Sequence, residues 1–319
     1  MYVAVLNEQV LGERLGYDVR DAHSRVLLRA GTKLTRPYIE LLRRRGFRSV
    51  PVGDPLAPEA VPEDVLRETT RTAAHATVAM CLARQGGGDG AFAAAAREVV
   101  EQILCDVFAR PRLLYHVASL RSVHEDILVH SVNVCVYSVI LGPILGLGRD
   151  ELRDLGIGAL LHDIGKVYHM DLVGKPGRLT PEEFERMQGH AADGFDLLRQ
   201  DPELNRLSAQ VALQHHERLD GSGYPRGLLA ADIHPWARLV AVADVYDALT
   251  GDRTYGSAQT PVAALTEVRR LAQEGKLDAC LVSHIAWVRL FWRDIAGRKC
   301  DPRRAMVPRR AWLPLRNWA

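Results

Sequence analysis

The sequence predicts a mainly α-helical protein in which a helical bundle follows a small N-terminal α/β module. Apolar residues recur with helical spacing from about residue 120 onward. Residues 1–53 instead contain short β-rich pieces separated by turn glycines. A glycine-rich run at residues 86–90 interrupts the helical pattern between these two parts. We therefore expect four segments: the α/β module at 1–53, connecting helices at 54–119 with a joint at 86–90, the bundle at 120–288, and a tail at 289–319.

Strand-like and helical stretches alternate within the N-terminal module. Residues 2–6, 26–28 and 48–52 favour strands, and residues 35–45 have helical spacing. A sensing or dimerising role and a purely structural cap both remain open for this module. Residues 62–84 and 91–109 then favour helices whose apolar spacing exceeds what a solvated linker requires, so pairing between subunits of a homodimer is one role for them.

Helical periodicity continues through the bundle, with predicted helices near residues 123–142, 150–163, 181–199, 204–217, 235–250 and 261–274. The run Thr180-Pro181-Glu182-Glu183 supports one of these boundaries. A threonine can cap a helix, a proline suits its first position, and the second glutamate can complete a capping box.

Composition places the chain among ordinary globular proteins. At 319 residues it can bury a large core. Its five cysteines, an odd number without paired spacing, predict reduced thiols and a cytoplasmic location; they are Cys81, Cys105, Cys135, Cys280 and Cys300. No basic N-terminal region precedes a long apolar run, and no window approaches the roughly 20 apolar residues of a membrane span. We therefore expect no span.

The formal net charge of +2 is unevenly distributed. Residues 289–319 hold nine Arg or Lys against two Asp, a formal +7, so the remainder of the chain carries −5. Trp292, Trp312 and Trp318 lie among these arginines. A basic surface with aromatics can engage nucleic acid, anionic lipid or an acidic protein. We expect instead that the tryptophans pack across the domain and that nucleic acid is not the partner.

Two ordered runs concentrate metal-ligating side chains. His162-Asp163 lies in Leu161-His-Asp-Ile-Gly-Lys166, and His215-His216 begins a run that reaches Gly223-Tyr224-Pro225. Imidazole nitrogens and a carboxylate that can bridge two cations indicate a multinuclear site that activates water.

Three further residues complete this constellation. His130 and His190 lie in helical segments, where each is open to a second interpretation as a satisfied or surface histidine. Asp244 interrupts the apolar run 239–245, and a buried carboxylate there needs a cation or several donors. We therefore expect Asp244 to bind metal.

These residues resemble an HD-GYP domain over roughly residues 120–285. The resemblance is carried by His130-Ser131, residues 161–166, 175–180, His190, residues 215–225, Gly227-Leu228, residues 242–249 and Asp252-Arg253. It implies an HD-type helical bundle and a metal-dependent phosphodiesterase that hydrolyses the bacterial second messenger cyclic di-GMP to pGpG or GMP. It also implies a ligand set for two metals, bridged by Asp163: His162, Asp163, His190, His215, His216 and Asp244.

In members with a third metal, His130 ligates it together with a carboxylate one helical turn earlier. That position is Asp126 here, whereas such members tend to carry glutamate. The alternative to a ligand role for Asp126 is a solvated carboxylate at the start of the helix. Iron or manganese is the expected metal, in two or three sites. The loop after Lys166 departs from the family pattern and is one residue shorter before Lys175, so the substrate groove is expected to be reshaped. His169 in this loop is an extra ligand, a substrate contact or a plain loop residue.

The expected mechanism divides the remaining roles. Two cations would bring the pKa of a bridging water near neutrality, and the resulting hydroxide would attack the phosphodiester. Lys166 would add charge at that phosphate, and Arg253 would bind the second one, unless it is only a surface residue. We also expect Lys175 and Tyr224 to contact substrate, although Tyr224 can equally anchor its loop.

Glu217 and Asp220 either orient ligand imidazoles or hold their loop together. Asp247, one turn beyond Asp244, is expected to support the ligands from behind. The alternative to an enzyme is a cyclic-dinucleotide-responsive module that acts through signalling partners with little turnover. A general HD-type phosphohydrolase is disfavoured by the glycine-tyrosine-proline loop.

Overall fold

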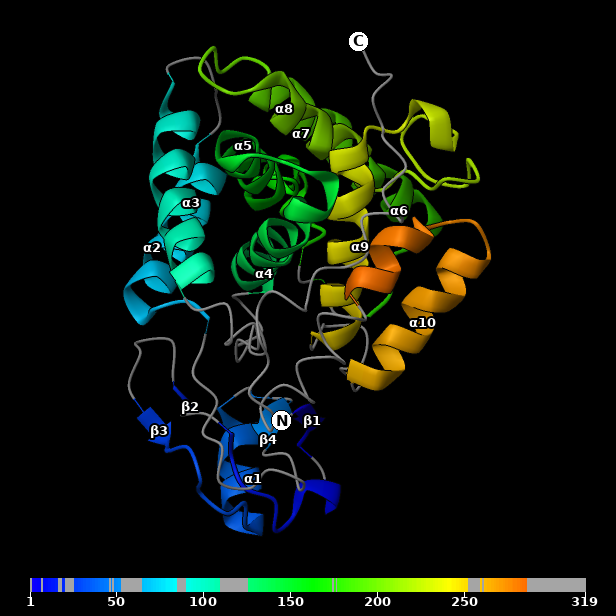
Figure 1. Ribbon diagram of the computed structural model, residues 1–319. Coiled ribbons are helices and arrows are strands. Elements are labelled where there is room, and N and C mark those ends of the chain that lie inside the picture. Colours follow the sequence, from blue (N-terminus) through cyan, green and yellow to red (C-terminus); the bar gives the residue numbers. More distant parts are fainter. Residues whose placement is uncertain are drawn as a thin grey trace, which may run out of the picture.

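Figure 1 shows the computed structural model of the chain. It describes residues 2–6, 8–16, 19–20, 26–45, 47, 49–52, 65–84, 90–109, 126–173, 175, 177–251, 259 and 261–285. The predictions for joint residues 86–89, the tail 289–319 and Arg253 lie outside the described residues, as does the side chain of Asp126.

The N-terminal module is a small α/β unit, as predicted. Strand β1 (Tyr2–Val5) pairs antiparallel with β4 (Ser49–Val52), and β2 (Val19–Arg20) pairs antiparallel with β3 (Val26–Leu28). A 3-10 helix, η1 (Glu8–Val10), and the helix α1 (Arg36–Arg44) complete it. Helix α1 follows Thr35, has proline in its first turn, and buries Ile39 and Leu42 in the module's own apolar core.

Every helix or strand in the rest of the described chain is a helix (Figure 1). Its elements are α2 (Glu68–Ala83), α3 (Ala91–Ala109), α4 (Asp126–Leu141), η2 (Gly142–Leu145), α5 (Arg149–Leu160), η3 (Ile164–His169), α6 (Pro181–Gln188), α7 (His190–Leu198), α8 (Arg206–Gln214), η4 (Ala230–Asp232), α9 (Pro235–Thr250) and α10 (Pro261–Gln273). Helix α4 packs against α2, α5 and α9, and α8 packs against α5, α7 and α9. The mainly α fold is thereby confirmed.

Helices α2 and α3 are part of this bundle. Val78 of α2 and Val100 of α3 are buried in the same apolar core as α4 and α5. Two buried carboxylates hold these helices. Asp106 of α3 accepts hydrogen bonds from the backbone N–H and Nε of Arg67, which precedes α2. Asp201, which follows α7, accepts one from the backbone N–H of Ala93 in α3. The apolar faces that suggested pairing between subunits are thus used inside one chain.

The predicted helix at 181–199 is interrupted. The capping box at its start is present, because Glu183 N–H donates to Thr180 Oγ1 and Thr180 N–H donates to a Glu183 carboxylate oxygen. The helix nevertheless ends at Gln188, and Gly189 separates it from α7. At this break the N–H of Gly189 donates to the carbonyl of Arg186, three residues earlier, which tightens the turn. His190 therefore starts a helix, where the periodicity had placed it in mid-helix.

The segment Ile127–Leu145, which covers α4 and η2, is long and apolar enough to cross a membrane by length and composition alone. The expectation that no window approaches that limit was too strict. In the structure 72% of its most apolar window is buried, since this segment forms the middle of the bundle. Such burial is what the core helix of a large helical bundle requires.

The described cysteines, Cys81, Cys105, Cys135 and Cys280, are all free thiols, as expected. One histidine outside the candidate site is also notable. His75 on α2 is largely buried, and burial together with the neighbouring Arg71 lowers the pKa of His75 from 6.5 to about 4.

Candidate metal centre

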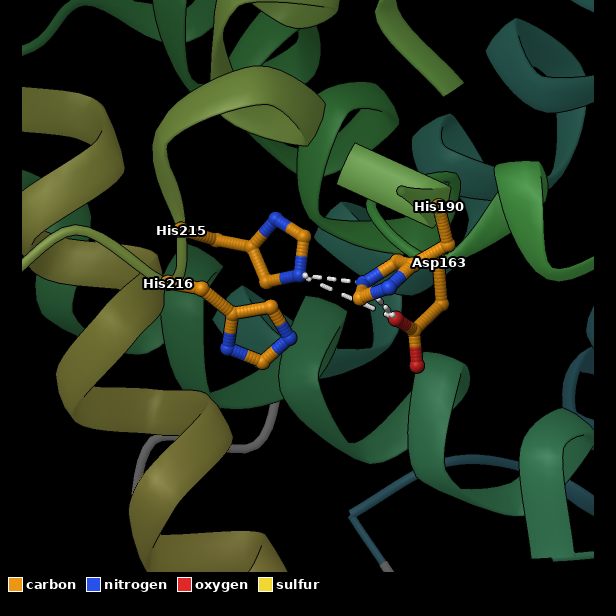
Figure 2. Close-up of side chains that lie close together, drawn as sticks. All are labelled: Asp163, His190, His215 and His216. Atoms are coloured by element: carbon orange, nitrogen blue, oxygen red, sulfur yellow. Dashed lines mark hydrogen bonds and ion pairs between the residues drawn. The ribbon is translucent and has the colours of Figure 1, made fainter. Parts of the chain in front are cut away.

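The predicted ligands converge from five parts of the bundle. His130 lies inside α4, and His162 and Asp163 follow the end of α5. His190 begins α7, His215 and His216 follow α8, and Asp244 lies inside α9. Figure 2 shows Asp163 and the rings of His190, His215 and His216 pointing toward one another. Tertiary packing thus brings together all seven residues in one place.

Asp163 lies at the centre, with each carboxylate oxygen facing a different pair of histidines. Its Oδ1 is 3.3 Å from Nε2 of His190 and 3.7 Å from Nε2 of His215. Its Oδ2 is 3.5 Å from Nε2 of His162 and 3.7 Å from Nε2 of His130. Two groups of potential ligand atoms therefore share Asp163, each within 4.8 Å: one with His190, His215 and His216, the other with His130 and His162.

Backbone carbonyls determine which ring nitrogen faces the centre. Nδ1 of each of three histidines lies within hydrogen-bond distance of the carbonyl three residues earlier: His162 with Ala159 at 2.7 Å, His190 with Met187 at 2.6 Å and His215 with Ala212 at 2.8 Å. A carbonyl oxygen only accepts, so Nδ1 carries the proton of the neutral ring. Each Nε2 therefore directs a lone pair at the centre, which is the form that binds a cation.

The arrangement leaves electron pairs facing one another. Nε2 of His190 and Nε2 of His215 are 3.4 Å apart. Nε2 of His162 and Oδ1 of Asp163 are buried and have no hydrogen-bond partner among the described residues. Unpartnered buried acceptors are costly, and a cation between them removes that cost. The mixed nitrogen and oxygen set fits divalent first-row metals.

The protonation states also suit metal binding. Burial lowers the pKa of His162 to about 3 and also lowers those of His190 and His216. Burial alone would raise the pKa of Asp163, but the adjacent Lys166 ammonium holds that pKa well below its usual range. At neutral pH these three imidazoles are therefore neutral and the Asp163 carboxylate is ionised.

Asp244 and Asp247, one turn apart on α9, contact the two nitrogens of the His130 ring. Nε2 of His130 is 3.1 Å from Asp244 Oδ1, and Nδ1 is 2.7 Å from Asp247 Oδ2. Asn133 in turn donates from Nδ2 to Asp247 Oδ1 at 2.8 Å. The pKa of Asp244 is also held low: burial raises it, but the contact with His130 outweighs burial.

Asn133 was missed by the sequence interpretation. Its position offered a signal, because it lies three residues after His130 in an apolar stretch and so shares a helix face with it. Asn133 is 2% exposed, so its side chain is hydrogen-bonded to Asp247 and shielded from solvent.

Glu217 and Asp220 make contacts within their own loop. The carboxylate of Glu217, 2% exposed, accepts hydrogen bonds from the backbone N–H groups of Arg226 at 2.8 Å and Leu228 at 2.9 Å. Asp220 accepts from the N–H and hydroxyl of Ser222. Of the two roles considered, these contacts favour holding the loop that carries Tyr224.

The predicted substrate contacts are placed differently from one another. Lys166 Nζ lies 2.5 Å from Asp163 Oδ2, and its side chain is 20% exposed, so it reaches both the centre and solvent. Lys175 instead pairs with Glu183 at 2.5 Å on the first turn of α6.

The ring of Tyr224 lies against His216, with centroids 4.6 Å apart and an angle of 32°. His169 Nε2 contacts Asp193 Oδ2 at 2.8 Å, which favours its interpretation as a loop residue.

A close backbone contact positions Asp163 against His190. A Cβ added to Gly165 would lie 2.5 Å from the amide nitrogen of Gly194 on α7, and closer still to the carbonyl oxygen of His190. Only glycine lets η3 and α7 approach to this distance without displacement. The glycine in the His-Asp-Ile-Gly-Lys run is therefore part of how the centre is built.

Residues 112–281 match the HD domain family, and the chain belongs to this family. It is 38% identical over 179 residues to a cyclic di-GMP phosphodiesterase of Pseudomonas aeruginosa, a match that covers 56% of this chain and 42% of that protein. It is 34% identical over 167 residues to 3'3'-cGAMP-specific phosphodiesterase 2 of Vibrio cholerae, covering 51% of this chain and 32% of that protein. The matches thus span less than half the length of these relatives.

The fold resembles that of Bd1817, an HDG"Y"P protein from Bdellovibrio bacteriovorus. The TM-score is 0.56 at 16% identity, and the match covers 93% of this chain and 100% of that one. At this identity the likeness concerns the fold, and it agrees with the helical bundle predicted above.

Proposed function

We propose that this chain is a metal-dependent phosphodiesterase that hydrolyses cyclic di-GMP to pGpG or GMP in bacterial second-messenger signalling. The observation that carries the proposal is the set of imidazole lone pairs directed at both oxygens of Asp163 in a buried centre. The relative from Pseudomonas aeruginosa, a cyclic di-GMP phosphodiesterase, supports the substrate class.

The ligands of the proposed two-metal site divide between the oxygens of Asp163. His190, His215 and His216 would serve one cation, and His162 and Asp244 the other, with Asp163 bridging. His130 would join the second group or hold a third cation with Asp126, the first residue of α4. We propose iron or manganese, because both accept this mixed nitrogen and oxygen set.

When bound, divalent cations supply an activated water and offset charge on the phosphate. The chain's own residues do the rest. Asp163 keeps its charge because Lys166 lies beside it, and the exposed part of Lys166 can contact a phosphate oxygen. Tyr224 limits the space beside His216. Arg253 and Lys175 remain proposed substrate contacts, and Lys175 would have to exchange its contact with Glu183 for one with substrate.

The test is hydrolysis of cyclic di-GMP by anaerobically prepared protein reconstituted with Fe(II) or Mn(II), with products identified by chromatography. Asp163→Ala should abolish turnover and lower the metal content, since it removes the shared ligand. Asp193→Ala is a matched control, because Asp193 is a carboxylate on α7 that contacts His169 rather than the centre. A chain that regains less than about one metal ion would contradict the metal assignment.

Binding without turnover would instead favour the second candidate, a cyclic-dinucleotide-responsive module that acts through partner proteins. Full metal loading, measurable nucleotide binding and no product define that outcome. Parallel assays with 3'3'-cGAMP would establish whether the guanine-only dinucleotide is preferred, since a relative is specific for 3'3'-cGAMP.

The organisation of the chain is also part of the proposal. We place the catalytic domain at residues 120–288, after an α/β module at 1–53 and helices at 54–119 that pack on it, and before the basic tail at 289–319. The free thiols among the described cysteines support a cytoplasmic location. A homodimer would have to use surfaces other than the apolar faces of α2 and α3 that are buried in the bundle.

A further inference from the structure

A series of aromatic rings leads outward from the candidate metal centre. The ring of Tyr224 lies 4.6 Å from that of His216, and the ring of Phe184 lies 6.4 Å from that of Tyr224 at an angle of 80°. Exposure increases along the series, since His216 is mostly buried while Phe184 is 51% exposed. A single exposed phenylalanine is ordinary, but this one is in ring contact with a tyrosine that lies against a potential metal ligand.

The segments that carry the two outer rings are held by separate polar contacts. Phe184 is the fourth residue of α6, whose first turn is held by the capping box and by the ion pair of Lys175 with Glu183. The Tyr224 loop is held by the bond from its N–H to the carbonyl of His216 and by Glu217. Neither ring depends on the other for its position, so the pair is preorganised.

The rings of Phe184 and Tyr224 are nearly perpendicular, and Phe184 is one ring away from His216. The exposed part of the Phe184 ring is available to a planar group beside the candidate metal centre. Nucleic-acid bases stack readily on aromatic side chains because every base has a π face. Stacking of a base on a half-exposed apolar ring is favourable, because it removes the exposed surface of that ring from water.

We propose that Phe184 is a substrate-binding residue that stacks against a guanine base of the cyclic dinucleotide while a phosphate lies at the metal centre. This inference rests on the proposed function. Phe184 contributes to substrate binding and takes no part in bond cleavage, so its loss acts on KM and leaves kcat nearly unchanged.

The experiment compares Phe184→Ala and Phe184→Tyr in the metal-loaded full chain. Phe184→Ala should raise the KM for cyclic di-GMP about tenfold, within the range of base–aromatic stacking, and Phe184→Tyr should restore it. Phe108→Ala is the matched control, because Phe108 on α3 is similarly exposed, at 47%. The control should retain the wild-type KM.

A binding measurement separates this inference from the proposed function. The probe is a phosphorothioate cyclic dinucleotide with 2-aminopurine in place of one guanine, which resists hydrolysis and loses fluorescence when its base stacks. Wild type should quench it, and Phe184→Ala should bind about tenfold more weakly with less quenching. If wild type binds and quenches the probe but does not hydrolyse cyclic di-GMP, the enzymatic function fails while the stacking stands. Equal KM, affinity and quenching in Phe184→Ala and wild type would overturn the stacking, as would a wild type that binds no probe.

Discussion

Replacing Gly165 with alanine tests how the backbone builds the metal centre. The added Cβ would lie 2.5 Å from the amide nitrogen of Gly194 and closer still to the carbonyl oxygen of His190, whereas Cβ atoms in real proteins stay beyond 3.0 Å. Helices η3 and α7 must therefore separate by more than the roughly 0.5 Å that the Gly194 contact alone requires, up to about 1 Å. The obstructing atoms are backbone and cannot rotate away. Asp163 and His190 lie on the two sides of this contact. The 3.3 Å distance between Asp163 Oδ1 and His190 Nε2 should therefore change too.

We expect two measurable effects. Overpacking of this kind lowers the free energy of unfolding by about 1–3 kcal/mol, which urea titration of the metal-free protein would detect. Misplacement of ligands by a fraction of an ångström should lower metal content after reconstitution and reduce kcat/KM by up to about 100-fold.

Gly148→Ala provides the control for this prediction. Gly148 precedes α5 with a φ of −76°, and the nearest atom to an added Cβ is 3.7 Å away, in the Glu151 side chain. The free energy of unfolding of this variant should fall by less than about 1 kcal/mol, and its metal content should equal that of wild type. Wild-type metal content and kcat/KM in Gly165→Ala would refute the argument that the close approach of η3 and α7 sets the ligand geometry.

Three further predictions follow from single contacts. Asp247→Asn should weaken metal binding about 10- to 100-fold in competition with a chelator, because the charge that orients His130 is lost; unchanged affinity would exclude this role. Glu217→Gln should lower the free energy of unfolding by about 1–3 kcal/mol in urea, since an amide accepts fewer of the two N–H bonds; Asp220→Asn, at an exposed site, should not. Because the folded pKa of His75 is about 4 against 6.5 when unfolded, the unfolded state binds more protons between these values. His75 alone should therefore lower the free energy of unfolding by about 3 kcal/mol as pH drops from 6.5 to 4. In pH-resolved urea titrations His75→Gln should lose that part of the pH dependence, while the other buried histidines retain theirs.

Features that depend on neighbouring residues were predictable from the sequence. Helix α9 occurs at 235–250 as expected, and the Thr180 capping box forms, because apolar spacing and caps act within one or two turns. The break at Gly189 was not predicted, since both flanking segments have helical periodicity and only the hydrogen bonds of this turn separate them.

Contacts between helices needed the structure. Asn133 and Asp247 are 114 residues apart in the chain, and nothing in either segment specifies that they meet. Lys175 was expected at the substrate and pairs with Glu183, a residue already engaged in the capping box. Phe184 was overlooked because a phenylalanine in a helix is ordinarily core, and its exposure becomes visible only once the bundle is packed.

By itself the sequence determined the helical class, most element positions and the chemical types of the candidate ligands, because periodicity, caps and residue chemistry are local properties. Only the tertiary structure decided which oxygen of Asp163 faces which histidine, and that Glu217 holds the loop of Tyr224. These relations depend on distances of a few ångströms between separate elements. Such distances result from the packing of the whole core, so no short stretch of residues encodes them.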